Sequence, residues 1–561
     1  MKDSEKLRKK VESEFDRITD AFGGESYWAI HNIIRRIDFI FPLYRTDDPK
    51  QKKIVEELRT FYSYGWGVLL KKYYKDVDIT KSQPFTLMTS ELVSWCDSNI
   101  IYSGKLSFCK QLIEYEKSKL IKISETKENE FVFDYNHKHN GLERFDKESL
   151  NFYVNNIVEK IILERQKIKS FDENEIRKEL KRIISSPDGK MIVYHSTPLL
   201  DEYYNQRGHF HMLRSQGYDD FDKKDIFGDI EYWRYIDLIE IIMGTSIMRL
   251  EACLELVKSN PNIDLHNILS YTCFQDKEIK MYAHYLSMSV HEISQILSCV
   301  TLTKDNYNYY LDYPSAPPPM YFEVGNNLFV KSIAGVLTNP VLLLNKELKR
   351  RYKKDYDKSV NNREDRFRRE LFEFFPDERI IKIPRGVNIF FQGIKTDIDA
   401  IVYDTKTKNL GLFQLKWQDP YGYSMKERYS RISNLFDKAN EWVDKMKYWV
   451  LNNDAKTIIN SLQINKKNMK FSEINEVKIF VLSRNQMNFT GVELNDTVAW
   501  SSWHQLIESQ ASVELSLDDP ITEMFVKTKA LEPKRRVEYG EVDKIEPFTM
   551  EFKDFNVSYN N

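Results

Sequence analysis

Residues 396–417 read TDIDAIVYDTKTKNLGLFQLKW, and this stretch decides how the C-terminal part of the chain folds. Two apolar runs that alternate with period two flank a connector, 404–409, that is rich in turn-forming residues. This pattern predicts a β-hairpin. Because residues two apart on a strand point to the same side, Gln414 and Lys416 should share one face of the second strand with Leu412.

Polar residues interrupt the apolar character of this hairpin at Asp399, Gln414 and Lys416. A lysine between apolar residues of a strand is costly to bury without a partner, and Asp399 with a metal ion beside it would provide one. An Asp followed on the next strand by Gln-x-Lys resembles the catalytic core of the PD-(D/E)XK nuclease superfamily, also called restriction-endonuclease-like. In that family the two strands splay to hold Mg²⁺. An ordinary solvated hairpin face is the alternative.

The resemblance implies one role for each of these residues. Asp399 matches the metal-binding Asp, Gln414 the second ligand position, which is usually Glu, and Lys416 the lysine that orients or deprotonates the attacking water. Hard oxygen ligands suit Mg²⁺ (or Mn²⁺), which retains several waters and lowers the pKa of one of them. Because Gln lacks the charge of Glu, we expect weaker metal binding, and a catalytically inactive nuclease fold is an alternative.

The helix expected before the hairpin supplies a third acidic position. Residues 363–375 read REDRFRRELFEFF and end at Pro376, which stops a helix. Apolar residues form one stripe along this helix, at Phe367, Leu371, Phe374 and Phe375. Glu364 lies within the stripe and Glu370 near its edge, so Glu364 is predicted to complete the metal site, with Glu370 as the alternative. A carboxylate stabilised only by the helix dipole is the other interpretation of Glu364.

The segments after the hairpin complete an α-β-β-α-β order typical of this superfamily. Residues 427–451 carry apolar residues at three-and-four spacing, which predicts a helix with one buried face. The runs 476–482 and 498–507 predict a strand and a strand-to-helix segment. The resemblance covers residues 361–510.

Basic residues lie near the predicted site. Lys395, before the hairpin, and Arg428, at the start of the next helix, are predicted to contact nucleic-acid phosphates. For Arg428 the alternative is an arginine that lies along apolar surface with its head in water. Residues 346–369 contain eleven Lys or Arg against five Asp or Glu. Such a patch would make phosphate binding salt-dependent, and a solvated helix face is the alternative.

Composition narrows the class of protein. A chain of 561 residues and 66.9 kDa should form two or three domains. No apolar run is long enough to span a bilayer, and the charged N-terminal sequence is not a secretion signal. The five cysteines are dispersed without a CxxC pair, which argues against a zinc site and a disulfide scaffold. We therefore expect a cytoplasmic protein with reduced thiols. A net charge of −2 excludes a general polyanion binder.

The proline run YPSAPPPM at 313–320 marks the clearest boundary. The chain is predicted to be an α+β multidomain protein with four parts: a helical region at 1–312, a Pro-rich linker and hairpin at 313–345 with a Gly-Asn-Asn turn, a nuclease core at 346–515 that begins with a basic helix, and a C-terminal extension at 516–561. A fragment that begins near Met320 should fold on its own.

The N-terminal half contains no catalytic pattern. Its periodicity predicts helices at 4–22, 51–74, 147–169, 173–185, 231–258 and 278–301, with short β-runs at 128–135 and 191–194. His209 and His211, like His137 and His139, are interpreted as surface histidines. There is no GxxxxGK[ST] loop for ATP hydrolysis. This half is predicted to be a sensor, oligomerisation or partner-binding module.

Together these features predict a Mg²⁺-dependent nuclease that hydrolyses phosphodiester bonds of DNA. A large helical region attached to such a nuclease resembles prokaryotic effectors of defence against phage or plasmids, and this assignment is by analogy. A DNA repair or recombination nuclease is a second enzymatic possibility. The alternative that is not an enzyme is a nucleic-acid-binding or scaffold protein with an inactive nuclease fold.

Overall fold

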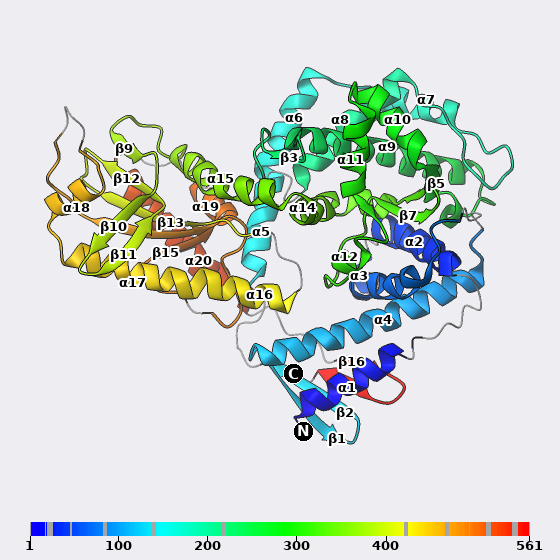
Figure 1. Cartoon of the computed structure of the whole chain (residues 1–561), viewed down its shortest axis with the longest axis horizontal. Coiled ribbons are helices and arrows are strands. Elements are labelled where there is room, and N and C mark those ends of the chain that lie inside the picture. Colours follow the sequence, from blue (N-terminus) through cyan, green and yellow to red (C-terminus); the bar gives the residue numbers. More distant parts are fainter. Residues whose placement is uncertain are drawn as a thin grey trace.

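A computed structural model of the chain describes residues 2–16, 18, 26–44, 48–81, 87–135, 142–215, 220–419, 424–465, 470–492, 494–511, 518–540 and 548–559. The protein is a mixed α/β structure. Figure 1 shows a C-terminal part built on a sheet, at the left, and a larger, mostly helical N-terminal part at the right. A small sheet lies below the two parts, near both labelled chain ends and beside helix α1.

The hairpin predicted at 396–417 is confirmed. It consists of β12 (Ala400–Asp404) and β13 (Leu410–Lys416), which pair in antiparallel fashion with Ala400 opposite Phe413. The two strands lie inside a five-stranded sheet of order β15-β14-β13-β12-β9. Strand β9 (Ile380–Ile383) pairs antiparallel with β12, whereas β14 (Val477–Ser483) and β15 (Ala499–Ser502) continue from β13 in parallel.

Alternating side chains of β13 enter two separate cores, as predicted. Leu412 packs on one face of the sheet with α17 (Lys438–Leu451) and α18 (Ala455–Ser461). Phe413 packs on the opposite face with the helices α15 (Lys353–Phe372), α19 (Trp503–Ala511) and α20 (Pro520–Gly540). Helices cover both faces of the central strands, which explains why these strands are apolar throughout.

A second hairpin stands before the central one. It is formed by β10 (Val387–Phe391) and β11 (Ile394–Ile398), which pair only with each other. The predicted 427–451 helix is present but is divided into α16 (Met425–Ile432), a π-helical turn at Ser433–Asp437, and α17. The indole of Trp442 on α17 donates a hydrogen bond to the carbonyl of Asp397 on β11 at 2.5 Å, so the long helix fixes this hairpin beside the sheet.

The N-terminal half is mostly helical, as predicted. Its helices are α1 (Asp3–Asp16), α2 (Ser26–Leu43), α3 (Pro49–Asp76), α4 (Ser90–Lys117), α5 (Arg144–Tyr153), α6 (Glu159–Ile168), α7 (Glu173–Ile183), α8 (Pro198–Arg214), α9 (Tyr232–Ser259), α10 (Gln275–Leu286), α11 (Val290–Cys299), α12 (Tyr307–Leu311), α13 (Ile333–Leu337) and α14 (Pro340–Arg351). Glycines allow α3 and α4 to approach closely. A Cβ at Gly65 would lie 1.9 Å from the carbonyl oxygen of Ile100, and one at Gly104 would lie 2.0 Å from that of Phe61.

Three details of the N-terminal half differ from prediction. The helix expected at 278–301 is two helices, α10 and α11, because the chain turns through a left-handed conformation at Ser287. The run 191–194 forms only a single β-bridge, between Ser185 and Val193. His209 and His211, interpreted as surface histidines, are both partly buried on helix α8, and the His211 ring donates a hydrogen bond to the Leu337 carbonyl at 3.2 Å. His137 and His139, and part of the 4–22 run, lie outside the described residues.

The proline run is not an exposed linker, and this prediction is wrong. Ala316 and Met320 are 4% and 1% exposed, and the indole of Trp66 donates a hydrogen bond to the Ala316 carbonyl at 3.1 Å. The hairpin that follows, β7 (Tyr321–Gly325) and β8 (Leu328–Lys331), lies in a sheet of order β5-β8-β7-β6. Its other strands are β5 (Tyr271–Phe274) and β6 (Thr301–Leu302), so 313–345 belongs to the N-terminal core.

Two segments cross between the halves. Helix α5 packs on α19, and the buried carboxylate of Asp146 accepts hydrogen bonds from the backbone N–H groups of Met487 and Asn488 at 3.0 and 2.8 Å. At the other end of the chain, β16 (Phe548–Glu551) and β17 (Asn556–Tyr559) form one sheet with β1 (Ile121–Lys127) and β2 (Glu130–Tyr135). The predicted division at residue 320 therefore cuts through shared sheets and cores.

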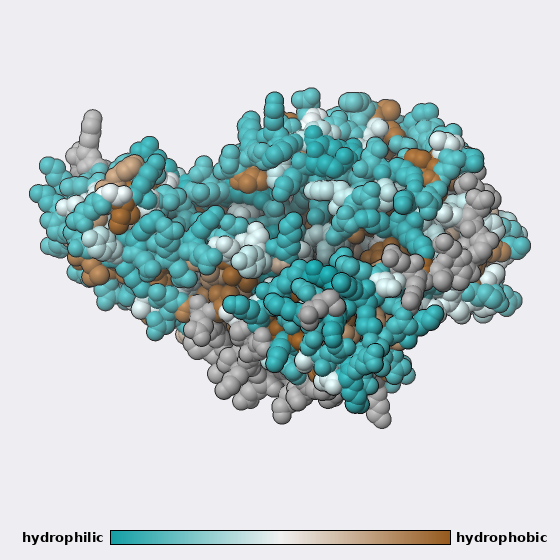
Figure 2. Space-filling model, turned by 60° about the horizontal axis from the view of Figure 1, so that its bottom comes forward, coloured by the Kyte–Doolittle hydropathy of each residue, from teal (hydrophilic) through white to brown (hydrophobic). Residues whose placement is uncertain are grey.

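The remaining global features agree with the sequence. The described helices include none that is long and apolar enough to cross a membrane. All five cysteines are free thiols, and four of them are buried. Figure 2 shows one face of the molecule, where hydrophilic residues predominate and hydrophobic residues lie in separate patches.

Candidate functional site

Asp399 lies at the junction between β11 and β12, at the end of the central hairpin. Its side chain is 3% exposed. Its Oδ2 atom accepts hydrogen bonds from the backbone N–H of Leu415, at 2.7 Å, and from the side-chain amide of Gln414. Its own N–H donates to the carbonyl of Phe413 at 3.1 Å. The structure therefore brings together the Asp and the Gln that the sequence predicted as neighbours.

The environment of Asp399 disfavours a negative charge. Burial is the largest cause and raises the pKa of this carboxyl to about 7. The nearby carboxylate of Glu364 raises the pKa further, while Lys416 and the Leu415 N–H oppose the shift. A buried carboxylate that is held beside a second one favours a cation, because a cation would compensate the charge of both.

Glu364 reaches the same site from α15. Its side chain is 49% exposed, and burial raises its pKa, with Arg368 opposing and Asp397 adding to the shift. Lys416 also acts on Glu364. Charged groups from the helix and the hairpin thus influence one another within a single site. The half-exposed carboxylate faces solvent at a point where a ligand can approach it.

The other acidic candidate on this helix lies elsewhere. The carboxylate of Glu370 accepts a hydrogen bond from Nε of Arg366 at 3.0 Å and another from Arg484. The guanidinium carbon of Arg484 lies 4.6 Å from the ring centroid of Trp417, on the side of the sheet where α15 and α19 pack. Of the two alternatives, the geometry places Glu364 and not Glu370 beside Asp399.

Arg368 connects the helix to the hairpin, and sequence reasoning missed it. This side chain is buried, and its Nη2 donates a hydrogen bond to Oε1 of Glu364 at 2.7 Å. Its Nε donates to the backbone carbonyl of Asp399, and its Nη1 to Asp365. The spacing of four residues between Glu364 and Arg368 was the available signal, since such pairs face each other on a helix. Arg368 fixes the position of Glu364 relative to Asp399.

Lys416 lies near the two carboxylates but bonds to neither of them. It is partly buried at the end of β13, and its ammonium group makes no ion pair or hydrogen bond with any residue that the structure describes. Asp399 and Glu364 nevertheless lie within electrostatic range of it. A lysine with three free N–H donors beside two carboxylates can donate to an incoming anion or to a water molecule.

The donor set fits a hard divalent cation. Asp399 uses only Oδ2 for hydrogen bonds, so Oδ1 is available, and the Oε1 atom of Gln414 accepts no hydrogen bond within the described part of the chain. With Glu364 these atoms provide two carboxylates and one amide oxygen, which suits an ion that keeps several waters. Across the described ranges there is no group of three or more His, Cys, Asp or Glu side chains that could hold a metal ion. The proposed set therefore depends on the amide of Gln414.

The two residues predicted to contact phosphate differ in their exposure to solvent. Arg428 is buried, and its guanidinium donates hydrogen bonds to Glu143 at 3.0 and 2.8 Å and to the Thr490 carbonyl at 2.6 Å. Arg428 joins the N-terminal half to the C-terminal part. Both the predicted phosphate contact and the alternative of a guanidinium in water are therefore wrong. Lys395 is exposed on β11, and its Nζ lies 5.6 Å from the ring centroid of Phe390. Lys395 remains accessible to a ligand.

Much of the basic run at 346–369 is paired inside the protein. The buried carboxylate of Glu347 accepts hydrogen bonds from Arg350 and Arg351, both at 2.7 Å. Arg363 is also buried and binds Asp419 at 2.6 Å. These arginines stabilise the fold, so the local excess of positive charge in the sequence is not a continuous phosphate-binding surface.

Comparison of the chain with family models, with curated proteins and with solved structures finds no match in any of the three.

Proposed function

We propose that the protein is a metal-dependent nuclease of the restriction-endonuclease-like type that hydrolyses phosphodiester bonds of DNA. The observation that carries the proposal is the convergence of Glu364, Asp399 and Gln414 next to an unpaired Lys416. The order of the surrounding elements supports it. Helix α15, the β12–β13 hairpin, α17 and the parallel strand β14 follow one another as that fold requires.

The residues have distinct tasks in the proposed reaction. Glu364, Asp399 and Gln414 would hold Mg²⁺ or Mn²⁺, which neutralises phosphate charge and lowers the pKa of a bound water. Lys416 would donate hydrogen bonds to the attacking water and to a phosphate oxygen, where negative charge grows in the transition state. The attacking water gives up a proton to solvent as its oxygen bonds to phosphorus and the bond to the leaving oxygen breaks. The leaving oxygen takes up a proton from solvent.

Gln414 gives this site a property that Glu would not. Without a metal, the Gln414 amide donates a hydrogen bond to the Asp399 carboxylate, whereas a Glu carboxylate at position 414 would repel the Asp399 carboxylate. The amide thus stabilises the metal-free arrangement and contributes less charge to metal binding. This contact also supports the alternative, an inactive nuclease fold that binds nucleic acid.

A plasmid-nicking assay separates the two possibilities. Purified protein should convert supercoiled DNA to open circles with Mg²⁺ or Mn²⁺, and EDTA should stop the reaction. Asp399→Ala should lower the rate by several orders of magnitude, because metal ions contribute several kcal/mol at such transition states. Asp444→Ala, an exposed acid on α17, is the matched control and should retain full activity. DNA binding without metal-dependent nicking would favour the inactive fold.

The cellular role is proposed by analogy. A defence effector against phage or plasmids would use the N-terminal half for sensing or assembly, and a repair or recombination nuclease would use it for partner binding. Plaque formation on cells with and without the intact gene tests the first role. An Asp399→Ala chain that protects as well as the intact one would exclude nuclease-based defence.

A further inference from the structure

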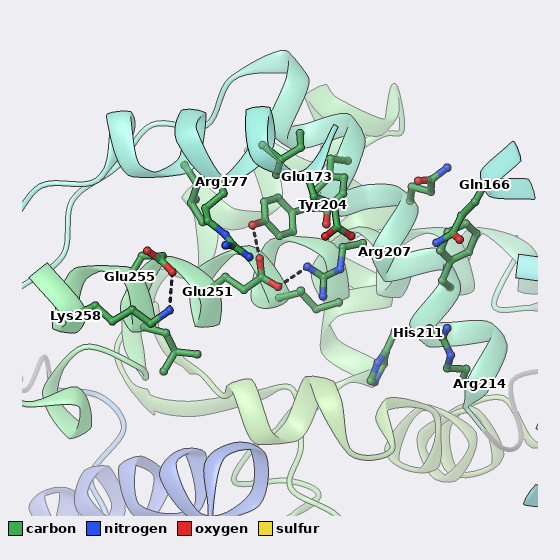
Figure 3. A pocket seen from close by; sticks show the side chains of 17 residues that line it. Gln166, Glu173, Arg177, Tyr204, Arg207, His211, Arg214, Glu251, Glu255 and Lys258 are labelled. Carbon is green, nitrogen blue, oxygen red and sulfur yellow. Dashed lines mark hydrogen bonds and ion pairs between the residues drawn. The ribbon is translucent and has the colours of Figure 1, made fainter. Parts of the chain in front are cut away.

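A cavity of about 550 Å³ lies in the N-terminal half, away from the candidate nuclease site. Residues from four helices line it, α6, α7, α8 and α9 (Figure 3). Its volume is in the range of sites that take small molecules. None of the residues that form the proposed nuclease site lines this cavity.

Basic side chains from three of these helices line the cavity: Arg177 from α7, Arg207 and Arg214 from α8, and Lys258 from α9, of which Arg214 pairs with Glu159. Two of the three lining carboxylates are already neutralised. Glu251 accepts hydrogen bonds from the Tyr204 hydroxyl, at 2.6 Å, and from Arg207, while Glu255 pairs with Lys258 at 2.7 Å. The tight contact with Glu251 holds the Arg207 guanidinium at the cavity wall.

Arg177 is the cationic group left for a ligand. It makes no hydrogen bond or ion pair with any other residue in the described ranges, and Figure 3 shows it extending from α7 towards Glu251 and Tyr204. An arginine fork that is not occupied by a carboxylate of the protein matches the oxygen pairs of a phosphate group. Within the described residues Arg207 bonds Glu251 through Nη1, which leaves its other N–H groups, together with those of Arg177, as donors to an anion from two different helices.

An aromatic surface lies beside these arginines. The guanidinium carbon of Arg207 lies 5.6 Å from the ring centroid of Tyr203 and 5.8 Å from that of Tyr204. Planar bases stack on such tyrosine rings and guanidinium planes. Glu173 also lines the cavity, one helical turn before Arg177. Its carboxylate can accept hydrogen bonds from the amino or imino groups of a base.

We propose that this cavity binds a nucleoside phosphate. The phosphate groups bind Arg177 and Arg207, the base lies against Tyr203 and the Arg207 guanidinium, and the donor edge of the base faces Glu173. One turn of helix separates Glu173 from Arg177, so the two side chains lie on the same face of α7 and can contact one ligand. This binding site does not depend on the proposed nuclease activity.

Isothermal titration calorimetry of the full chain tests the proposal. ATP, GTP, CTP and UTP are titrated separately in EDTA, which removes any contribution from a metal-dependent site. At least one nucleotide should bind in a 1:1 ratio with a Kd below about 1 mM, and tripolyphosphate and the matching nucleoside should each bind at least about tenfold more weakly. Charge-assisted hydrogen bonds of about 1.5–3 kcal/mol predict that Arg177→Gln weakens binding by about 10- to 100-fold.

Lys178→Gln is the matched control. Lys178 is exposed, follows Arg177 on α7 and does not line the cavity, so its replacement removes the same charge without removing the contact. Both variants are first shown to have wild-type melting curves. Failure of all four nucleotides to bind, or an unchanged Kd in Arg177→Gln, would overturn the proposal. An equal loss of nucleotide affinity in both variants would indicate general charge attraction and would also overturn the proposal. Tripolyphosphate that binds as tightly as the nucleotide would overturn the role of the base.

Discussion

Asp399→Asn should stabilise the metal-free protein at pH 8. Burial raises the pKa of this carboxyl from its ordinary value of 3.8 to about 7. At a pH between these two pKa values, the folded protein holds a proton at Asp399 that the unfolded chain has released. The contribution of Asp399 to the free energy of unfolding is therefore present below pH 4 and is lost as pH rises through 7.

The size of the effect follows from the two pKa values. Their difference of about three corresponds to about 4 kcal/mol at pH 8, at about 1.4 kcal/mol per pKa unit. At pH 5 only part of this free energy has been lost, and the expected gain from the substitution is below about 2 kcal/mol. Asn keeps an oxygen that can accept the hydrogen bond from the Leu415 N–H, so the substitution removes the charge and preserves this contact.

Urea unfolding in EDTA at pH 5 and pH 8 measures both values. Asp444→Asn, an exposed acid on α17, should change the free energy of unfolding by less than about 0.5 kcal/mol at either pH. Added Mg²⁺ should stabilise the wild type but not Asp399→Asn, because binding to the folded state alone shifts the unfolding equilibrium. Loss of stability in Asp399→Asn at pH 8, or the same gain at both pH values, would refute the reasoning.

Four further substitutions probe other parts of the structure. Glu364→Gln should lower the nicking rate by at least about tenfold. Glu370→Gln should retain most activity, because the Glu370 carboxylate pairs with Arg366 and Arg484 and not with the proposed site. The reverse ranking of the two variants would contradict the proposed site. Lys416→Ala should lower turnover by about 100-fold or more while a gel-shift assay finds DNA affinity nearly unchanged, and parallel losses would make it an anchoring residue. Relative to wild type, Lys331→Met should become less stable as pH rises from 7 towards 10, because burial lowers the Lys331 pKa and the wild type loses the cost of the buried charge over this range, as urea unfolding at several pH values would measure. A stability difference between Lys331→Met and wild type that does not vary with pH would exclude this explanation.

Local patterns predicted the centre of the C-terminal part well. Alternation at 396–417 specified both the hairpin and the faces of β13, because each face is buried under its own layer of helices. The same logic brought Asp399 and Gln414 together. Periodicity also favoured Glu364 over Glu370, but the expected reason is wrong: the Glu364 side chain is 49% exposed and that of Glu370 is 25% exposed, and the two carboxylates differ instead in the groups that they contact.

Contacts between distant segments were not predictable from these patterns. Arg428 has the helix position of a phosphate ligand, yet its partner is Glu143, which lies 285 residues away in the sequence. The proline run was interpreted as exposed because polyproline segments often are, but Trp66 and Tyr310 bind its carbonyls. The four-residue spacing indicated a pair between Arg368 and Glu364, but an arginine on a charged helix gives no sign that it also reaches the backbone of a strand.

The sheet formed by β1, β2, β17 and β16 has a consequence for synthesis of the protein. Strand β2 has been made by residue 135, but β17, its parallel partner, is not complete until residue 559. While the intervening residues are translated, one edge of β2 has no native strand to pair with, and unpaired edges attract other chains. The nascent protein should therefore depend on chaperones longer than its early helices suggest, and premature termination before residue 548 should yield aggregates rather than a smaller folded protein.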